Sequence, residues 1–218
     1  MLFDITEAMF FNESSFFRDL KPFTTFRKTV LSQLVARRES KKQIRIWSAA
    51  CSSGQETYSL AMQCEEEYTK LQGWRVDIIG TDISKEMISR AKNGVYTQLE
   101  VQRGLPILML LKYFQQIGDK WQINERTRQM VQFSESNLLN DFHSLGVFDV
   151  IFCRYVLSNF DPANKKKILD CLKASLAPDG VLFLGKDESI TGLSNDFRLA
   201  PPENDYYILD QKIGAKTK

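Results

Sequence analysis

The chain has 218 residues, of which 43% are hydrophobic and 26% are charged, a composition typical of a folded globular protein. Lys and Arg outnumber Asp and Glu by 29 to 27, a net charge of +2, so the composition provides no general attraction for nucleic acid or anionic lipid. No apolar run approaches the ~18 residues that cross a bilayer. The start, Met1–Asp4, lacks a secretory signal pattern, so neither a membrane span nor export is expected.

The cysteines give no metal-binding pattern. Cys51, Cys64, Cys153 and Cys171 form no C-x-x-C pair, and the chain has a single His, which leaves few ligands for zinc. We therefore expect reduced thiols, no metal site and a cytoplasmic protein.

The first ~40 residues carry apolar side chains at helical spacing, with a break expected at Pro22. A strand at 44–48 follows, then a loop of small residues, a helix at 56–68 and a strand at 74–80 that ends in Thr81-Asp82. Ser84 is a plausible N-cap for a helix at 85–92. This strand–helix–strand order is typical of a parallel sheet with right-handed crossovers.

The second half of the chain predicts further elements. They are a helix at 106–114, short strands at 120–123 and 130–133, a buried strand at 148–153, a helix that starts at Asp161-Pro162 and is closed by Gly180, and strands at 181–185 and 206–209. Because no long helix precedes the last strand, it is expected to pair antiparallel at a sheet edge. The fold class expected is therefore α/β with a mostly parallel sheet.

The loop Ser48–Gly54 follows a strand and opens a helix, so its small side chains would let a ligand approach the backbone. It is not the G-x-G-x-x-G of dinucleotide sites, which makes a dinucleotide dehydrogenase the least favoured function. Glu56 would benefit from the positive end of the helix dipole. The alternative for Glu56 is a helix-start acid that binds no ligand.

Asp82 ends the second strand, where an acid can accept both hydroxyls of a ribose. The alternative is an N-cap for the next helix, although Ser84 could fill that role. The loop and the acid, in register with one βαβ unit, predict nucleoside binding. Asn137 follows a later strand and could contact an adenine, or it could be a turn residue.

Five blocks of sequence together resemble the CheR-type family, the chemotaxis-receptor methyltransferases. In chain order they are Asn12–Asp19, Ile44–Glu56, Gly80–Ser84, Arg103–Pro106 and Phe148–Arg154. Any one block is weak, but five in family order, over about residues 3–209, are very specific.

The resemblance implies a Rossmann-like class I methyltransferase that uses S-adenosylmethionine and releases S-adenosylhomocysteine. It implies a seven-stranded sheet with an antiparallel last strand, and a small β-subdomain at about 115–130 that in some members grips a receptor tail peptide. Residues 43–218 would form the methyltransferase domain, and residues 1–42 would match the end of the family's N-terminal helical domain. The activity implied is protein-glutamate O-methylation of a chemoreceptor. We expect a monomer.

The same resemblance assigns roles to residues. Asn12, Ser14 and Arg18 would close over the cofactor, Glu56 and Asp82 would hold its amino-acid and ribose parts, Asn137 and Leu138 would flank the adenine, and Arg154 and Tyr155 would line the floor. Arg18 is the candidate catalytic cation, since its planar fork can hold a carboxylate through two donors. Its alternative is a surface Arg paired with Asp19 or a helix end. A glutamate with a pKa of about 4.3 is already a nucleophile, so no general base is needed.

The chain departs from the family where substrate would bind. The family usually has Asn after the Cys-Arg pair and Tyr four residues later, whereas this chain has Tyr155 and Asn159. Two alternatives therefore stay open. One is a protein that binds S-adenosylmethionine or S-adenosylhomocysteine for regulation, and the other is a methyltransferase with a different protein or small-molecule substrate.

Overall fold

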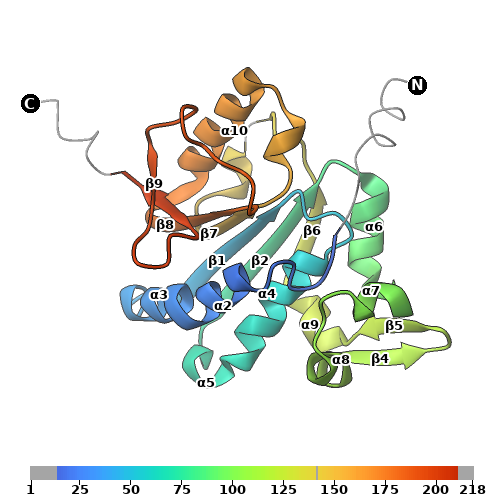
Figure 1. Ribbon diagram of the computed structural model, residues 1–218. Coiled ribbons are helices and arrows are strands. Elements are labelled where there is room, and N and C mark those ends of the chain that lie inside the picture. The colour runs from blue at the N-terminus through green and yellow to red at the C-terminus, as the bar shows by residue number, and fades with distance from the viewer. Residues whose placement is uncertain (1–13, 141, 211–218) are drawn as a thin grey trace, which may run out of the picture.

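The computed structural model describes residues 14–140 and 142–210. Its main sheet has seven strands in the order β6-β2-β1-β7-β8-β10-β9 (Figure 1). Five are mutually parallel: β1 (Gln43–Ala49), β2 (Arg75–Asp82), β6 (Val131–Glu135), β7 (Phe148–Cys153) and β8 (Leu176–Leu184). This arrangement confirms the predicted α/β class with a mostly parallel sheet.

The antiparallel end of the sheet differs from the prediction in one respect. β10 (Tyr207–Leu209) is antiparallel to β8, as expected, but it lies inside the sheet. β9 (Phe197–Leu199) pairs with its other side and forms the edge. Three residues are too few to show the alternation that predicts a strand, which is why β9 was not predicted.

Helices cover both faces of the sheet. One layer holds α2 (Lys21–Thr25), a π-helical turn η1 (Phe26–Val30), α3 (Leu31–Arg37), α4 (Gln55–Glu66), α5 (Tyr68–Leu71) and α6 (Lys85–Asn93); α10 (Pro162–Ser175) covers the other face (Figure 1). Pro22 lies in the first turn of α2, a position that proline tolerates. Most of the helix expected before Pro22 lies outside the described residues.

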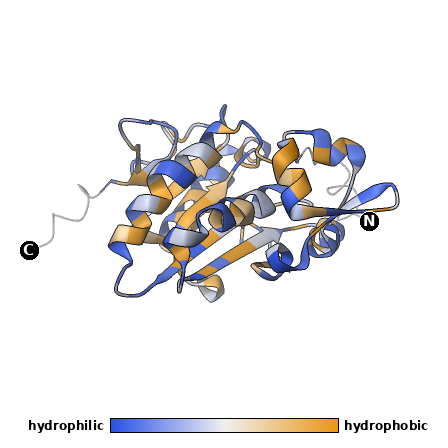
Figure 2. Ribbon diagram, turned by 90° about the horizontal axis from the view of Figure 1, so that it is seen from below, coloured by the Kyte–Doolittle hydropathy of each residue, from blue (hydrophilic) through white to orange (hydrophobic). Residues whose placement is uncertain are grey.

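Successive side chains of the central strands point to opposite faces of the sheet and so divide the core between the two faces. On β1, Ile46 packs with the α2–α4 side, while Trp47 packs with the α10 side. β7 does the same with Phe152 and Ile151. Hydrophobic colour accordingly runs along the strands between the helical layers (Figure 2). The sheet is therefore fully covered at its centre, as a parallel sheet requires.

Local signals explain where the helices begin and end. The hydroxyl of Ser84 accepts the Met87 N–H at 3.3 Å and caps α6. Asp161 caps α10 in the same way. α10 ends at Ser175, however, and not at Gly180 as predicted. Pro178 follows, and a residue before proline is biased toward extended backbone, so the chain enters β8 earlier.

A second, three-stranded antiparallel sheet forms a separate unit beside the main one (Figure 1). It contains β3 (Val95–Thr97), β5 (Lys120–Ile123) and β4 (Phe114–Ile117), with the short helices α7 (Gln98–Gln102), α8 (Ile107–Tyr113) and α9 (Glu125–Gln129) around it. Two further single turns are η2 (His143–Leu145) and η3 (Leu157–Asn159). The small sheet takes its third strand from Val95–Thr97, ahead of the expected range of about 115–130.

Within the described ranges, every helix is too short or too polar to cross a membrane. Among the same residues, no three His, Cys, Asp or Glu side chains gather where they could hold a metal ion.

Candidate functional site

A cavity of about 300 Å³ opens at the carboxyl ends of the parallel strands, the edge of an open α/β sheet where ligands bind. Its walls come from the segment before α2 and from the ends of β1, β2, β6 and β7. The lining residues are Ser14, Ser15, Arg18, Ala50, Cys51, Ser52, Glu56, Asp82, Ile83, Ser84, Ser136, Asn137, Leu138, Leu139, Arg154, Tyr155, Val156, Asn159 and Phe160.

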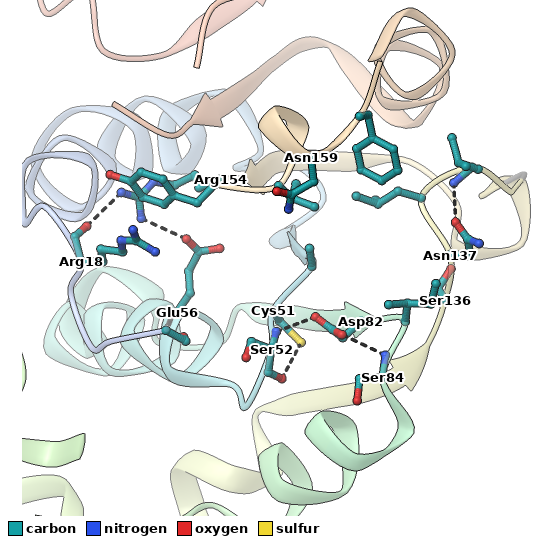
Figure 3. Close-up of a pocket in the computed structure, with 18 of the residues that line it drawn as sticks. Arg18, Cys51, Ser52, Glu56, Asp82, Ser84, Ser136, Asn137, Arg154 and Asn159 are labelled. Atoms are coloured by element: carbon teal, nitrogen blue, oxygen red, sulfur yellow. Dashed lines mark hydrogen bonds and ion pairs between the residues drawn. The ribbon is translucent and has the colours of Figure 1, made fainter. Parts of the chain in front are cut away.

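The structure brings the sequence-predicted residues together in this cavity. Eight of them are lining residues: Ser14, Arg18, Glu56, Asp82, Asn137, Leu138, Arg154 and Tyr155. Asn12 lies outside the described residues. Figure 3 shows Arg18, Glu56 and Arg154 at one end, and Asp82, Ser84 and Asn137 at the other.

Asp82 is fixed at the end of β2 by backbone groups. Its carboxylate accepts the Ser52 N–H at 2.7 Å and the Ser84 N–H at 3.0 Å, and the residue is 7% exposed. Ser52 and Ala50 have positive φ angles of 48° and 58°, so the loop after β1 bends tightly against β2. Ser84 provides the N-cap of α6, and Asp82 is thereby placed on the cavity wall rather than at the cap.

Asn137 forms a turn, one of the two alternatives that the sequence left open, and it also lines the cavity. Its side-chain oxygen accepts the Leu139 N–H at 2.9 Å, which is a local Asx turn. Asn137 and the buried Leu138 also line the cavity. This end of the site therefore offers both apolar and polar side chains beside Asp82.

The other end of the cavity contains a buried ion pair. Glu56 accepts the Ser48 hydroxyl at 2.9 Å and the Arg154 Nη1 at 3.0 Å. Burial raises the pKa of Glu56, and the charge of Arg154 opposes that rise. Glu56 is thus a buried acid in the first turn of α4. A buried charge is costly unless it is paired, and Arg154 provides the pair.

Arg154 links this end to the N-terminal segment. Its side chain is 1% exposed, and its Nη2 donates to the Asp19 carboxylate at 2.6 Å and to the Arg18 carbonyl at 3.0 Å. Asp19 was not predicted as a site residue. Its contact with Arg154 joins positions 135 apart, and no local pattern could have indicated it.

Tyr155 and Arg18 meet at the same end. The Arg18 guanidinium carbon lies 3.6 Å from the centroid of the Tyr155 ring. The Tyr155 hydroxyl donates to the Asp19 carboxylate, and burial together with this bond raises the pKa of Tyr155. Asn159 lines the cavity from the next turn of chain. The two positions that depart from the family pattern therefore both face the site.

Glu188 organises the loop that carries Tyr155. Glu188 follows the end of β8. Its carboxylate accepts the backbone N–H groups of Tyr155 at 2.7 Å and Leu157 at 2.8 Å, in the loop after β7. Tyr155 has a left-handed φ of 60°, which a non-glycine residue keeps only where its surroundings impose it. The sequence showed no sign of this role, because the bonded groups are more than 30 positions apart.

The profile of the CheR methyltransferase, SAM binding domain, matches residues 12–205. This chain belongs to the CheR methyltransferase family. Chemotaxis protein methyltransferase 1 of Vibrio cholerae is 41% identical over 88% of this chain and 70% of its own length. Chemotaxis protein methyltransferase 1 of Pseudomonas aeruginosa is 40% identical over 89% of this chain and 72% of its own length.

Among solved structures, PKMT2 from Rickettsia typhi in complex with AdoHcy matches 66% of this chain and 21% of its own chain. The identity is 21% and the TM-score 0.43, a likeness too low to bear on function.

The cofactor of this CheR-family chain is S-adenosylmethionine, and the cavity fits it. Its volume lies at the lower end of the ~300–1,000 Å³ typical of small-ligand pockets. Asp82 could accept the ribose hydroxyls, Leu138 could contact the adenine, and Glu56 could face the amino group. Among the described residues, the buried Ser52 Oγ and Arg154 Nε atoms have no protein partner, which leaves polar groups for a ligand.

Proposed function

We propose that this chain transfers a methyl group from S-adenosylmethionine to the side-chain carboxylate of glutamate residues on a chemoreceptor. The observation that carries this proposal is the placement of Arg18 on the cavity wall at the Glu56–Arg154 end. A guanidinium there can hold a carboxylate through two parallel N–H bonds. The names of the relatives, chemotaxis protein methyltransferases, support a receptor as the carrier of that carboxylate.

When bound, S-adenosylmethionine supplies a methyl group on a positively charged sulfur, and its transfer to a carboxylate oxygen leaves a methyl ester and a neutral thioether. The two charges cancel, so no proton moves. The work of this chain is therefore alignment and exclusion of water. Glu56, Asp82 and the Asn137–Leu138 pair would fix the cofactor, and Arg18 would orient the incoming carboxylate.

A glutamate carboxylate is ionised at neutral pH, since its ordinary pKa is about 4.3. The site consequently needs no general base. Its lining agrees with this, because the lining residues include no histidine. The two carboxylates of the cavity, Glu56 and Asp82, are both engaged by protein donors.

The arrangement of the chain follows from the same proposal. Residues 43–218 would form the methyltransferase domain, with residues 1–42 as the helical segment that brings Arg18 to the site. The small sheet would face the receptor. We propose a cytoplasmic monomer that meets the receptor at the membrane surface without insertion.

The test is methyl transfer from S-adenosylmethionine with a tritiated methyl group to vesicles that carry a chemoreceptor encoded by the same genome. The expected product is base-labile label on the receptor, lost when the receptor's candidate glutamates are replaced by alanine. Arg18→Ala should abolish most of the transfer while S-adenosylhomocysteine binds nearly as before. An equal loss of transfer and of binding would contradict this division of roles.

The departures at Tyr155 and Asn159 favour one second candidate, a cofactor-binding protein that regulates without methyl transfer. It predicts normal S-adenosylhomocysteine affinity in calorimetry and no labelled receptor. Label on another protein, or on a small molecule, would instead show a methyltransferase with a different substrate.

A further inference from the structure

We propose that Tyr155 is a positioning residue that holds the Arg18 guanidinium in the orientation needed to receive the substrate carboxylate. The inference rests on the proposed function, since it assumes a carboxylate substrate. Tyr155 is not part of the family pattern, which usually has Asn at this position. Four observations lead to it, each from a different part of the site.

The first observation is the backbone around Arg18. The neighbouring Phe17, Asp19 and Leu20 have positive φ angles of 49°, 67° and 46°. Left-handed backbone is strained for a non-glycine residue, so the segment needs anchors. Phe16 and Phe17 are buried, and the Phe17 N–H donates to the Ser59 hydroxyl at 3.0 Å. These anchors fix the backbone but leave the long Arg18 side chain to be fixed by other means.

The second observation is the contact between the two side chains. The guanidinium of Arg18 lies over the Tyr155 ring, with 3.6 Å between the guanidinium carbon and the ring centroid. Arginine stacks on aromatic faces and retains its N–H fork at the edges of the guanidinium. A free arginine side chain samples many rotamers, and ordering them costs entropy. A ring under the guanidinium removes part of that freedom before substrate arrives.

The third observation is that Tyr155 is itself held at both ends. Its backbone N–H donates to Glu188 at 2.7 Å, and its hydroxyl donates to the Asp19 carboxylate. The ring also lies against Gly185, where an added Cβ would come within 3.0 Å of the Tyr155 Cδ1. The platform under Arg18 is therefore rigid, and its hydroxyl ties it to the residue that follows Arg18.

The fourth observation separates this role from core packing. Tyr155 is only partly buried and belongs to neither hydrophobic core cluster. Its other aromatic contact is with the Arg154 guanidinium carbon, 5.1 Å from its centroid. Loss of the ring should therefore leave the fold and the Asp82 end of the cavity intact.

The test compares Tyr155→Phe, which retains the ring, with Tyr155→Leu, which removes it. The matched control is Tyr68→Leu, because Tyr68 also lies beside a guanidinium, at 5.7 Å from Arg126, but not in the cavity. We expect Tyr155→Leu to lower kcat/KM for receptor methylation about tenfold or more, with S-adenosylhomocysteine affinity changed less than about threefold. Tyr155→Phe should restore most of the rate, and Tyr68→Leu should change neither quantity.

A double-mutant cycle with Arg18→Ala decides whether Tyr155 acts through Arg18. If it does, Tyr155→Leu should have almost no further effect once Arg18 is alanine. Losses that multiply in the double variant would overturn the proposal. So would an equal fall in cofactor affinity and turnover, which is what a structural role predicts.

A readout independent of turnover separates this inference from the proposed function. In ¹⁵N-labelled protein with S-adenosylhomocysteine bound, the Arg18 Nε–H signal, assigned by its loss in Arg18→Lys, should be ring-shifted. It should move toward the position of a disordered arginine in Tyr155→Leu and stay in Tyr155→Phe. An unchanged signal in Tyr155→Leu overturns the inference. A signal that moves, in a protein that methylates no receptor, overturns the proposed function while the hold of Tyr155 on Arg18 stands.

Discussion

The carboxylate of Asp82 accepts the backbone N–H of Ser52 at 2.7 Å, which joins the ends of β1 and β2. The same carboxylate accepts the Ser84 N–H at 3.0 Å. The side chain proposed to receive the ribose therefore also shapes the loop against which the cofactor would lie. Ligand affinity and loop geometry should consequently respond together when Asp82 is changed.

Asp82→Asn should weaken S-adenosylhomocysteine binding by about 10- to 100-fold, since hydrogen bonds to a charged group contribute about 1.5–3 kcal/mol. Isothermal titration calorimetry measures the change. Asp77→Asn is the matched control, because Asp77 lies on the same strand but bonds to Gln43 and Arg75 away from the cavity. If both variants bind equally well, Asp82 does not hold the cofactor.

Glu56→Gln should alter how stability depends on pH. Burial raises the pKa of Glu56 in the folded chain, so its contribution is fully present below the unfolded value of about 4.3 and is lost as pH rises through the folded value. Loss of the pair with Arg154 should destabilise the variant, but its stability relative to the wild type should improve as pH rises through the folded pKa of Glu56. Urea unfolding at several pH values tests this, with the exposed Glu39→Gln as control. A relative stability that falls as pH rises would contradict the sign.

Gly104→Ala should disturb the N-terminal segment. Gly104 has a φ of 86°, and an added Cβ would lie 2.1 Å from the Phe16 carbonyl oxygen. Gly118 is the control, because its φ is 61° with nothing within 4 Å. We expect Gly118→Ala to cost about 1–2 kcal/mol from backbone strain alone. Gly104→Ala should cost more and should also lower turnover, because Phe16 is two residues from Arg18. Equal unfolding free energies of the Gly104→Ala and Gly118→Ala variants would show that the contact with Gly104 does not fix the N-terminal segment.

The four thiols should differ sharply in reactivity. Burial raises the pKa of the Cys51, Cys64 and Cys153 thiols, that of Cys64 to about 12. Cys171 is half-buried on α10. Because the thiolate is the reactive form, an aromatic disulfide reagent at pH 8 should titrate one thiol rapidly in the folded chain and all four in guanidinium. Cys171→Ser should remove the rapid phase. A rapid phase that persists would show that another thiol is accessible to the reagent.

The sequence predicted the features that depend on neighbours in the chain. Ser84 and Asp161 precede helices and cap them, and the apolar runs of β1 and β7 form buried central strands. Asp82 was found because a strand end places it at one edge of the sheet. Such features need only local spacing and the geometry of a parallel sheet.

The missed features join distant positions. Arg154 was expected on the floor of the site, but its ion pairs with Glu56 and Asp19 span 98 and 135 positions. Glu188 bonds to a loop 31–33 positions earlier. Nothing in the local sequence distinguishes these carboxylates from solvated ones. Only the completed fold determines which acid lies beside which donor.

The small sheet is an insertion in the chain between α6 and β6. Its two ends lie together, since the Ile123 N–H donates to the Gly94 carbonyl oxygen at 2.9 Å. A unit inserted through adjacent ends can change its length or surface without altering the register of β2 and β6. Under the proposed function, in which the small sheet faces the receptor, a change within residues 95–123 would alter partner choice while the crevice stays as it is.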